Sequence, residues 1–257
     1  MLTPPEIARS LLAAGESKAR LPFGKMLLLA ILAGAYIALA GVGATAAAVT
    51  VESGSLAKLL SACVFPAGLS MVILAGSELF TGNCLMVMAL LERRITPAQL
   101  LRNWLTVYLG NAMGGAAVAA LAVYSHTASL FGDGLARSMV SIAESKAALG
   151  FGDAFLRGVL CNFLVCLAVW MAAASKRAEG KVIALFFPIL LFVLCGYEHC
   201  IANLYYLPAG AFAAAEYGME TTLTLAGCLK NLAAVTLGNL VGGAALGVGY
   251  RFAYLKE

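Results

Sequence analysis

Glu78, Glu198 and His199 lie deep inside long apolar stretches of the sequence, and their types suggest hydrogen-bonding or proton-transfer chemistry. Glu78 and Glu198 occupy equivalent places in two strings of the form Gly-x-Glu-x-x-x-x-Asn. His199 follows the second glutamate, whereas Leu79 stands at the matching place of the first string. Such groups are costly in hydrocarbon unless they are paired or solvated. We expect the glutamates to accept hydrogen bonds from backbone N–H groups, and the alternative is a role in transport. His199 is either a satisfied packing residue or the donor of a hydrogen bond or proton to a ligand.

Two lysines near the ends of apolar stretches, Lys58 and Lys146, could concentrate anions at a pore mouth, or they could be ordinary solvated lysines. Asp153 and Arg157 are four residues apart, a spacing that predicts mutual neutralisation on one helix face. The seven cysteines include no C-x-x-C pair. We expect most of them to be inert small apolar residues, and the sequence predicts neither a metal site nor a cofactor.

The composition is that of an integral membrane protein. Of 257 residues, 62% are hydrophobic and 12% are charged, and the mean hydropathy is +0.91. About 20 apolar residues cross roughly 30 Å of hydrocarbon. Long, nearly uncharged stretches lie at about 24–50, 55–91, 98–124, 150–174, 182–216 and 222–249. The sequence therefore predicts an all-α membrane protein with six transmembrane helices.

Lysine and arginine residues gather before the first stretch, after the second and fourth, and at the end of the chain. This pattern predicts a multi-pass protein of the cytoplasmic (inner) membrane with both termini in the cytoplasm. It also accounts for most of the net charge of +4, so no nucleic-acid partner is expected. Residues 1–22 begin with a capping box, Thr3 to Glu6, and predict a short cytoplasmic helix. That helix either gates the pore or contacts the membrane surface or another subunit.

The chain contains an internal repeat. Residues 101–115 align without gaps with residues 229–243, and eight of the fifteen positions are identical. Each repeat holds three crossings, so the second must be inserted upside down relative to the first, as in channels and transporters. We expect a channel domain at 23–257, with repeats at about 23–125 and 148–250.

The second and fifth stretches are too long for one crossing and too short for two. Each is expected to be a helix broken near mid-membrane, where irregular backbone must line a cavity. Thr81, Gly82 and Asn83 are the expected breaking and capping residues of the first, and Asn203 of the second. The half-helix N-termini are expected to face an anion in a central pore.

Four strings resemble the formate/nitrite transporter family over essentially the whole chain. They are S-E-L-F-T-G-N at 77–83, C-N-F-L-V-C-L-A-V-W at 161–170, G-Y-E-H-C-I-A-N at 196–203 and V-T-L-G-N at 235–239. The resemblance implies an aquaporin-like six-helix protomer in a homopentamer, with one pore per protomer. It also implies a non-enzymatic, proton-linked route for small weak-acid anions such as formate, nitrite or hydrosulfide.

The resemblance also assigns roles to positions of this sequence. The pore residues that it implies are Thr81, Lys146, Asn162, His199 and Asn239. The apolar constrictions that it implies are Phe65 and Phe192 on the outer side and Leu69 and Phe80 on the inner side. The 82–84 stretch is closer to nitrite- or hydrosulfide-type members than to formate channels. In this scheme His199 gives the anion a proton or a strong hydrogen bond, and Thr81 positions the histidine.

Two other classes of protein stay open at this point. An aquaporin-like channel for neutral solutes shares the expected architecture, but the sequence lacks two Asn-Pro-Ala strings. A membrane-embedded enzyme could use His199 and Cys200, although no general base, metal cluster or nucleotide-binding loop accompanies them. Swelling assays would identify the first alternative, and turnover in detergent would identify the second.

Overall fold

The computed structural model describes residues 1–255, and every regular element in that range is helical. The α-helices are α1 (Pro4–Ala19), α2 (Phe23–Ala48), α3 (Gly54–Val64), α4 (Pro66–Ala75), α5 (Phe80–Asn83), α6 (Val87–Leu91), α7 (Pro97–Tyr124), α8 (Gly134–Ala148), α9 (Phe151–Ala173), α10 (Ala178–Leu194), α11 (Cys200–Glu216) and α12 (Leu225–Tyr254). Two 3-10 turns are η1 (Cys84–Met86) and η2 (Thr127–Ser129). The predicted all-α class is confirmed.

The second and fifth crossings are broken, as predicted, but the breaks lie earlier in the chain than expected. The backbone leaves α4 at Gly76, with φ 78°, and leaves the turn after α10 at Gly196, with φ 69°. Glycine adopts positive φ without the Cβ clash that other residues suffer. Thr81 and Asn83, expected at the first break, instead lie inside α5. Asn203 likewise lies inside α11.

Six crossings result from the described helices. Five helical stretches in residues 1–255 are long and apolar enough to span a membrane: α2, α3 with α4, α7, α9 and α12. The short apolar stretch Phe80–Leu91 continues the second crossing beyond its break. The fifth crossing is divided between α10 and α11, each of 17 residues. Each repeat thus has a continuous, a broken and a continuous crossing.

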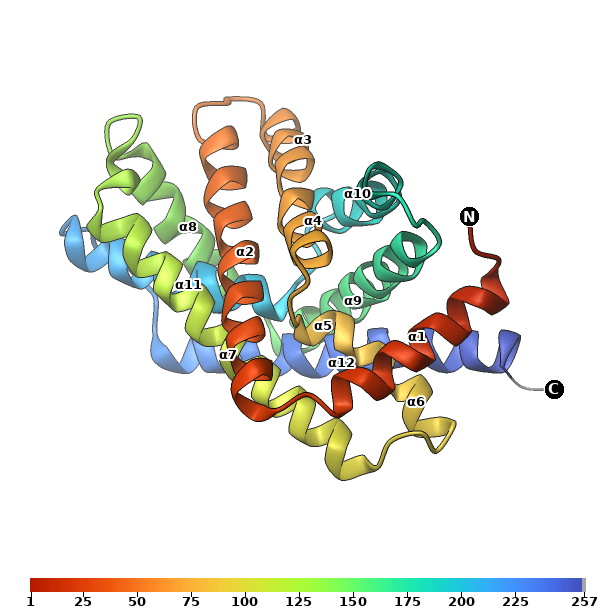
Figure 1. Cartoon of the computed structure of the whole chain (residues 1–257). Helices are drawn as coiled ribbons and strands as arrows, with labels where there is room; N and C mark the ends of the chain where they lie inside the picture. The colour runs from red at the N-terminus through yellow and green to blue at the C-terminus, as the bar shows by residue number, and fades with distance from the viewer. Residues whose placement is uncertain (256–257) are drawn as a thin grey trace.

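The two repeats use the same packing. The first crossing of each repeat lies against the third, α2 against α7 and α9 against α12 (Figure 1). The repeats meet where the hydroxyl oxygens of Tyr108 and Thr236 lie 3.0 Å apart. These residues hold matching positions in the aligned strings. A contact between equivalent residues must lie on the axis that relates the repeats, so this pair marks that axis.

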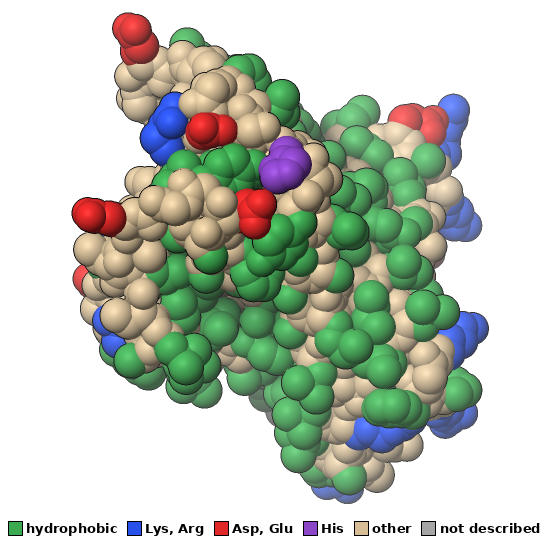
Figure 2. Space-filling model, turned by 90° about the vertical axis from the view of Figure 1, so that its left-hand side faces the viewer, with side chains coloured by type: hydrophobic (Ala, Val, Ile, Leu, Met, Phe, Trp, Pro, Cys, Tyr) green, Lys and Arg blue, Asp and Glu red, His purple; other side chains and the backbone are tan. Residues whose placement is uncertain are grey.

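Hydrophobic side chains cover much of the middle of the face seen in Figure 2, and most charged side chains lie at its upper left and along its right-hand margin. Exposed leucines occur on several spanning helices, among them Leu28, Leu105, Leu160 and Leu237. A surface of this kind is stable against hydrocarbon rather than water.

Gly242 lets α12 approach α9 closely. A Cβ at this position would collide with the carbonyl oxygen of Val159 and lie 3.1 Å from the backbone nitrogen of Phe163. Gly249, in the same helix, has no atom near its would-be Cβ. We expect Gly242→Ala to cost about 1–3 kcal/mol, because the obstacle is backbone. Gly249→Ala should be neutral or stabilising, since alanine favours helix. Thermal unfolding of both variants in detergent tests this, and equal melting temperatures would contradict it.

Candidate functional site

His199 lies at the second break and touches the segment that follows the first. It is the N-cap residue of α11, and its Nδ1 accepts the backbone N–H of Ala202 at 3.1 Å. Its Nε2 lies 2.9 Å from Oγ1 of Thr81. Because Nδ1 is an acceptor, a neutral ring carries its proton on Nε2 and donates it to Thr81. The hydroxyl proton of Thr81 is then left for another acceptor.

Aromatic rings cover one side of this histidine. The rings of Phe65 and Phe192 meet edge to face with centroids 5.7 Å apart, and the Phe192 centroid lies 5.8 Å from that of His199. Leu69 and Phe80 are also buried. All four expected constriction residues therefore lie in the protein interior, and the phenyl pair adjoins the imidazole.

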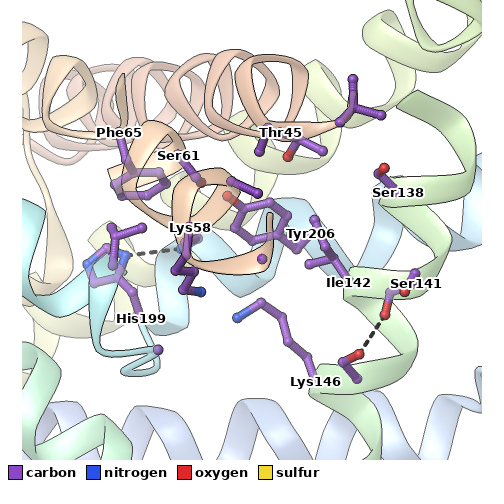
Figure 3. Close-up of a pocket in the computed structure, with 18 of the residues that line it drawn as sticks. Thr45, Lys58, Ser61, Phe65, Ser138, Ser141, Ile142, Lys146, His199 and Tyr206 are labelled. Atoms are coloured by element: carbon purple, nitrogen blue, oxygen red, sulfur yellow. Dashed lines mark hydrogen bonds between the residues drawn. The ribbon is translucent and has the colours of Figure 1, made fainter. Parts of the chain in front are cut away.

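A cavity of about 950 Å³ leads to the phenyl pair and His199. Figure 3 shows Lys58 of α3 and Lys146 of α8 entering it. Its lining residues that bear on function are Lys58, Ser61, Phe65, Lys146, Arg157, Phe192, Glu198 and His199. The Lys146 ammonium also lies 5.3 Å from the centroid of the Tyr206 ring. Among the lining residues of this cavity, the lysine and arginine side chains outnumber the single carboxylate, that of Glu198.

One expected ion pair is absent among the described residues. Asp153 and Arg157 form no salt bridge with each other. Four-residue spacing permits such a pair, but both side chains are exposed, and water competes well for exposed charges. Arg157 instead lines the cavity. Its guanidinium joins the cationic groups of Lys58, Arg137 and Lys146 in the cavity lining.

Lys146 belongs to a closed hydrogen-bonded network beside the second break. Its Nζ lies 2.9 Å and 3.1 Å from the two carboxylate oxygens of Glu198. Asn203 donates to the same carboxylate at 2.7 Å and to Asn231 at 2.8 Å. Asn231 in turn donates to the carbonyl of Lys146 at 2.8 Å. We expected Glu198 to bind backbone N–H groups, but its partners are side chains.

The same network recurs at the first break. Lys18 of α1 lies 2.7 Å from Glu78. Asn83 donates to Glu78 at 2.7 Å and to Asn103 at 2.9 Å. Asn103 donates to the carbonyl of Lys18 at 3.5 Å. Here too, side chains rather than backbone groups bind the buried carboxylate, so α1 and α8 perform equivalent roles.

Asn239 joins the second break to neighbouring backbone. Its Oδ1 accepts the first N–H of α11, from Cys200, at 2.9 Å. Its Nδ2 donates to the carbonyls of Gly158 at 2.8 Å and Glu198 at 2.9 Å. Both polar atoms of the Asn239 side chain therefore bond to backbone groups of the protein. The first N–H of α11 is therefore not available to an anion, contrary to our expectation.

Asn111 does the same at the first break. Its Oδ1 accepts the N–H of Phe80 at 3.0 Å, which occupies the first N–H of α5. Its Nδ2 donates to the carbonyls of Ala30 at 2.7 Å and Glu78 at 2.9 Å. Asn162, expected in the pore, donates to the carbonyls of Thr81 at 3.3 Å and Asn239 at 2.6 Å.

Sequence reasoning missed four of these residues, and the repeat contained the signal for all of them. Asn103 with Asn231 and Asn111 with Asn239 are identical pairs in the aligned strings. Extending the alignment upstream at the same spacing of 128 pairs E-S-K-A at 16–19 with E-S-K-A at 144–147. This extension identifies Lys18 as the partner of Lys146. Among residues 1–255, no cluster of three or more His, Cys, Asp or Glu side chains could hold a metal ion.

Six crossings in two inverted repeats, with the second break beside a cation-lined cavity, define a multi-pass membrane protein of the channel and transporter class. A sequence profile described as formate/nitrite transporter matches residues 5–253. The chain is 38% identical over 275 residues to a probable formate transporter of Methanothermobacter thermautotrophicus, covering 99% of this chain and 98% of that protein. The chain belongs to the formate/nitrite transporter family.

Solved structures agree with this membership. One, titled FNT family ion channel, has a TM-score of 0.86 and 32% identity, covering 96% of this chain and 98% of its own. Another, titled pentameric formate channel with formate bound, has a TM-score of 0.80 and 33% identity. The match covers 91% of this chain and 98% of that structure's chain.

The Lys146–Glu198 pair allows a stability test. The Glu198 side chain is only 7% exposed, so losing its cation leaves an uncompensated buried charge. We expect Lys146→Met to destabilise the protein by about 3–5 kcal/mol. Adding Glu198→Gln should recover much of the loss, because glutamine is neutral and can still accept from Asn203. Thermal unfolding in detergent measures both variants. A double variant no more stable than Lys146→Met would show that the pair does not act as a unit.

Proposed function

We propose that this protein is a proton-linked channel or transporter for small monovalent weak-acid anions, with formate, nitrite and hydrosulfide as candidates. The observation that carries the proposal is the His199–Thr81 pair, in which His199 lines a cation-lined cavity beside the phenyl rings of Phe65 and Phe192. The names of the matched relatives, which refer to formate, support the same substrate class.

The cavity and the rings impose opposite demands on an anion. Lys58 and Arg157 raise the local concentration of anions, whereas the charge of Lys146 is balanced by Glu198. Phe65 and Phe192 then require the permeant to leave water, which disfavours a bare charge. Moving a weak acid into an apolar passage raises its pKa, so it takes up a proton from solvent in the cavity. The neutral acid crosses the rings, and the anion and proton therefore move together.

His199 serves this passage as a hydrogen-bond donor rather than as the source of the proton. Its Nδ1 is committed to the Ala202 N–H, so protonating Nδ1 would break the N-cap of α11. Its Nε2 proton is directed at Thr81. The Thr81 hydroxyl can then donate to the permeant. The histidine was expected to give the anion either a proton or a strong hydrogen bond, and we propose the hydrogen bond.

We propose further that the protein forms a homopentamer in the cytoplasmic membrane, with one pore per protomer and both termini in the cytoplasm. The cavity and the His199–Thr81 pair are built from one chain, which supports one pore per chain. The solved relative titled pentameric supports the assembly. In this orientation Lys146 faces outward and Lys18 inward.

The proposed channel domain spans residues 23–257, of which 256 and 257 lie outside the described part. Its repeats lie at about 23–125 and 148–250. We include the helix of residues 1–22 as a working part of the inner mouth, because Lys18 pairs with Glu78 there. This pairing supports a structural role for α1 in place of a detachable gate.

Uptake into proteoliposomes tests the function and the role of His199. We expect wild-type protein to take up formate, nitrite or hydrosulfide faster as the pH falls. His199→Phe should reduce uptake at least about tenfold, since it removes the donor to Thr81 and the cap of α11. His199→Gln should retain the pH dependence, because an amide donates without titrating. Loss of pH dependence in His199→Gln would instead make the imidazole the proton source. Water or glycerol swelling without anion uptake would favour the aquaporin-like alternative.

Lys58 provides an electrostatic test of the cavity. We expect Lys58→Gln to raise the half-saturating anion concentration about two- to fivefold at low ionic strength, with a smaller effect at high salt. Lys230→Gln is the control, because Lys230 is exposed at the start of α12 and does not line the cavity. Anion flux through both variants, measured at a low and a high salt concentration, tests this expectation. Equal effects of the two variants would remove Lys58 from anion capture.

A further inference from the structure

The main-chain carbonyl of Thr81 is held by two side chains of α9. Asn162 Nδ2 and Cys166 Sγ each lie 3.3 Å from this oxygen. The backbone N–H of Cys84 is also directed at it. Asn162 and Cys166 are four residues apart and therefore share one face of α9. Cys166 was expected to be an inert apolar residue, but its thiol is a hydrogen-bond donor here.

Thr81 needs this external support because its own helix is short. It lies in α5, which has four residues and continues into the 3-10 turn η1. Isolated helical segments of this length do not hold their own geometry. Its hydroxyl must nevertheless stay within hydrogen-bonding distance of His199, which belongs to the other repeat. A small displacement of α5 would therefore separate the pair.

The thiol of Cys166 has little freedom to move. The residue is fully buried. Behind it lies Gly243 of α12, whose would-be Cβ would be 3.0 Å from Cys166 Sγ and 2.5 Å from Asn162 Nδ2. The helices thus close around both donors. Their positions relative to the Thr81 carbonyl are set by the packing of α9 against α12.

We propose that Asn162 and Cys166 are positioning residues that fix the Thr81 hydroxyl against His199 and toward the permeant. The inference deepens the function proposed above and rests on it. Neither residue has to touch the anion for this role. They act by holding the backbone of α5, and a misplaced Thr81 would bind the anion less well.

Cys166 is the better residue to vary, because Asn162 also supports Asn239. Cys166→Ala removes the donor, and Cys166→Ser keeps one. Cys161→Ala is the matched control: Cys161 is equally buried on α9, and its thiol makes no hydrogen bond among the described residues. Purified pentamers are reconstituted, and uptake of formate and nitrite is measured from pH 5 to pH 8.

We expect Cys166→Ala to lower uptake at pH 7 by about three- to tenfold, the equivalent of one modest hydrogen bond. Its pH profile should move to lower pH, because a weaker hydrogen bond to the anion makes flux depend more on the neutral acid. Cys166→Ser should restore both rate and profile. A fall in folded protein alone would scale uptake equally at every pH, so the profile separates positioning from a structural effect.

Two results would overturn the inference: a Cys166→Ala profile that matches wild type, or a loss that Cys161→Ala reproduces. Failure of the proposed function is a different result, in which wild-type protein carries none of the anions. In that case the structure of Cys166→Ala decides the positioning role. Separation of Thr81 Oγ1 from His199 Nε2 beyond hydrogen-bonding distance supports it, and an unchanged contact refutes it.

Discussion

Backbone polar groups that a broken helix leaves within a membrane must find partners inside the protein, because hydrocarbon offers none. Here Asn111 and Asn239 meet this requirement, each binding the first N–H of a half-helix and two carbonyls. The positions of His199 and Thr81 depend on these contacts, since both residues lie at the restrained half-helix ends. The contacts that stabilise the breaks therefore also position His199 and Thr81.

The buried carboxylates extend this principle to the two mouths. Glu78 and Glu198 would be unstable alone in the interior, and each is neutralised by a lysine from a helix that is not a crossing. The same contacts hold α1 and α8 over the ends of the broken crossings. Charge neutralisation and closure of the fold are thus achieved by the same residues. The cavity beside α8 adds the cations of Lys58 and Arg157, which form no ion pair among residues 1–255.

Much of this arrangement follows from the sequence, and the rest depends on tertiary contacts. Hydropathy, repeat identity and the length of two stretches predicted six crossings, the inversion and both breaks. The breaks themselves were misplaced, because Gly76 and Gly196 give no stronger local signal than Thr81 to Asn83. The predicted partners of Glu78 and Glu198 were wrong, because the observed partners come from segments up to 60 residues away in sequence. A thiol's role as donor, as in Cys166, has no sequence signature at all.

The contact between Tyr108 and Thr236 has a consequence for how such a chain can arise. Because this pair marks the axis between the repeats, a half-length chain would meet a second copy of itself at that point. Two such copies, inserted in opposite orientations, would already be self-complementary along α7 and its equivalent. Joining the halves in one gene product then frees each half to diverge. A single imidazole can consequently occur in one half while leucine persists in the other.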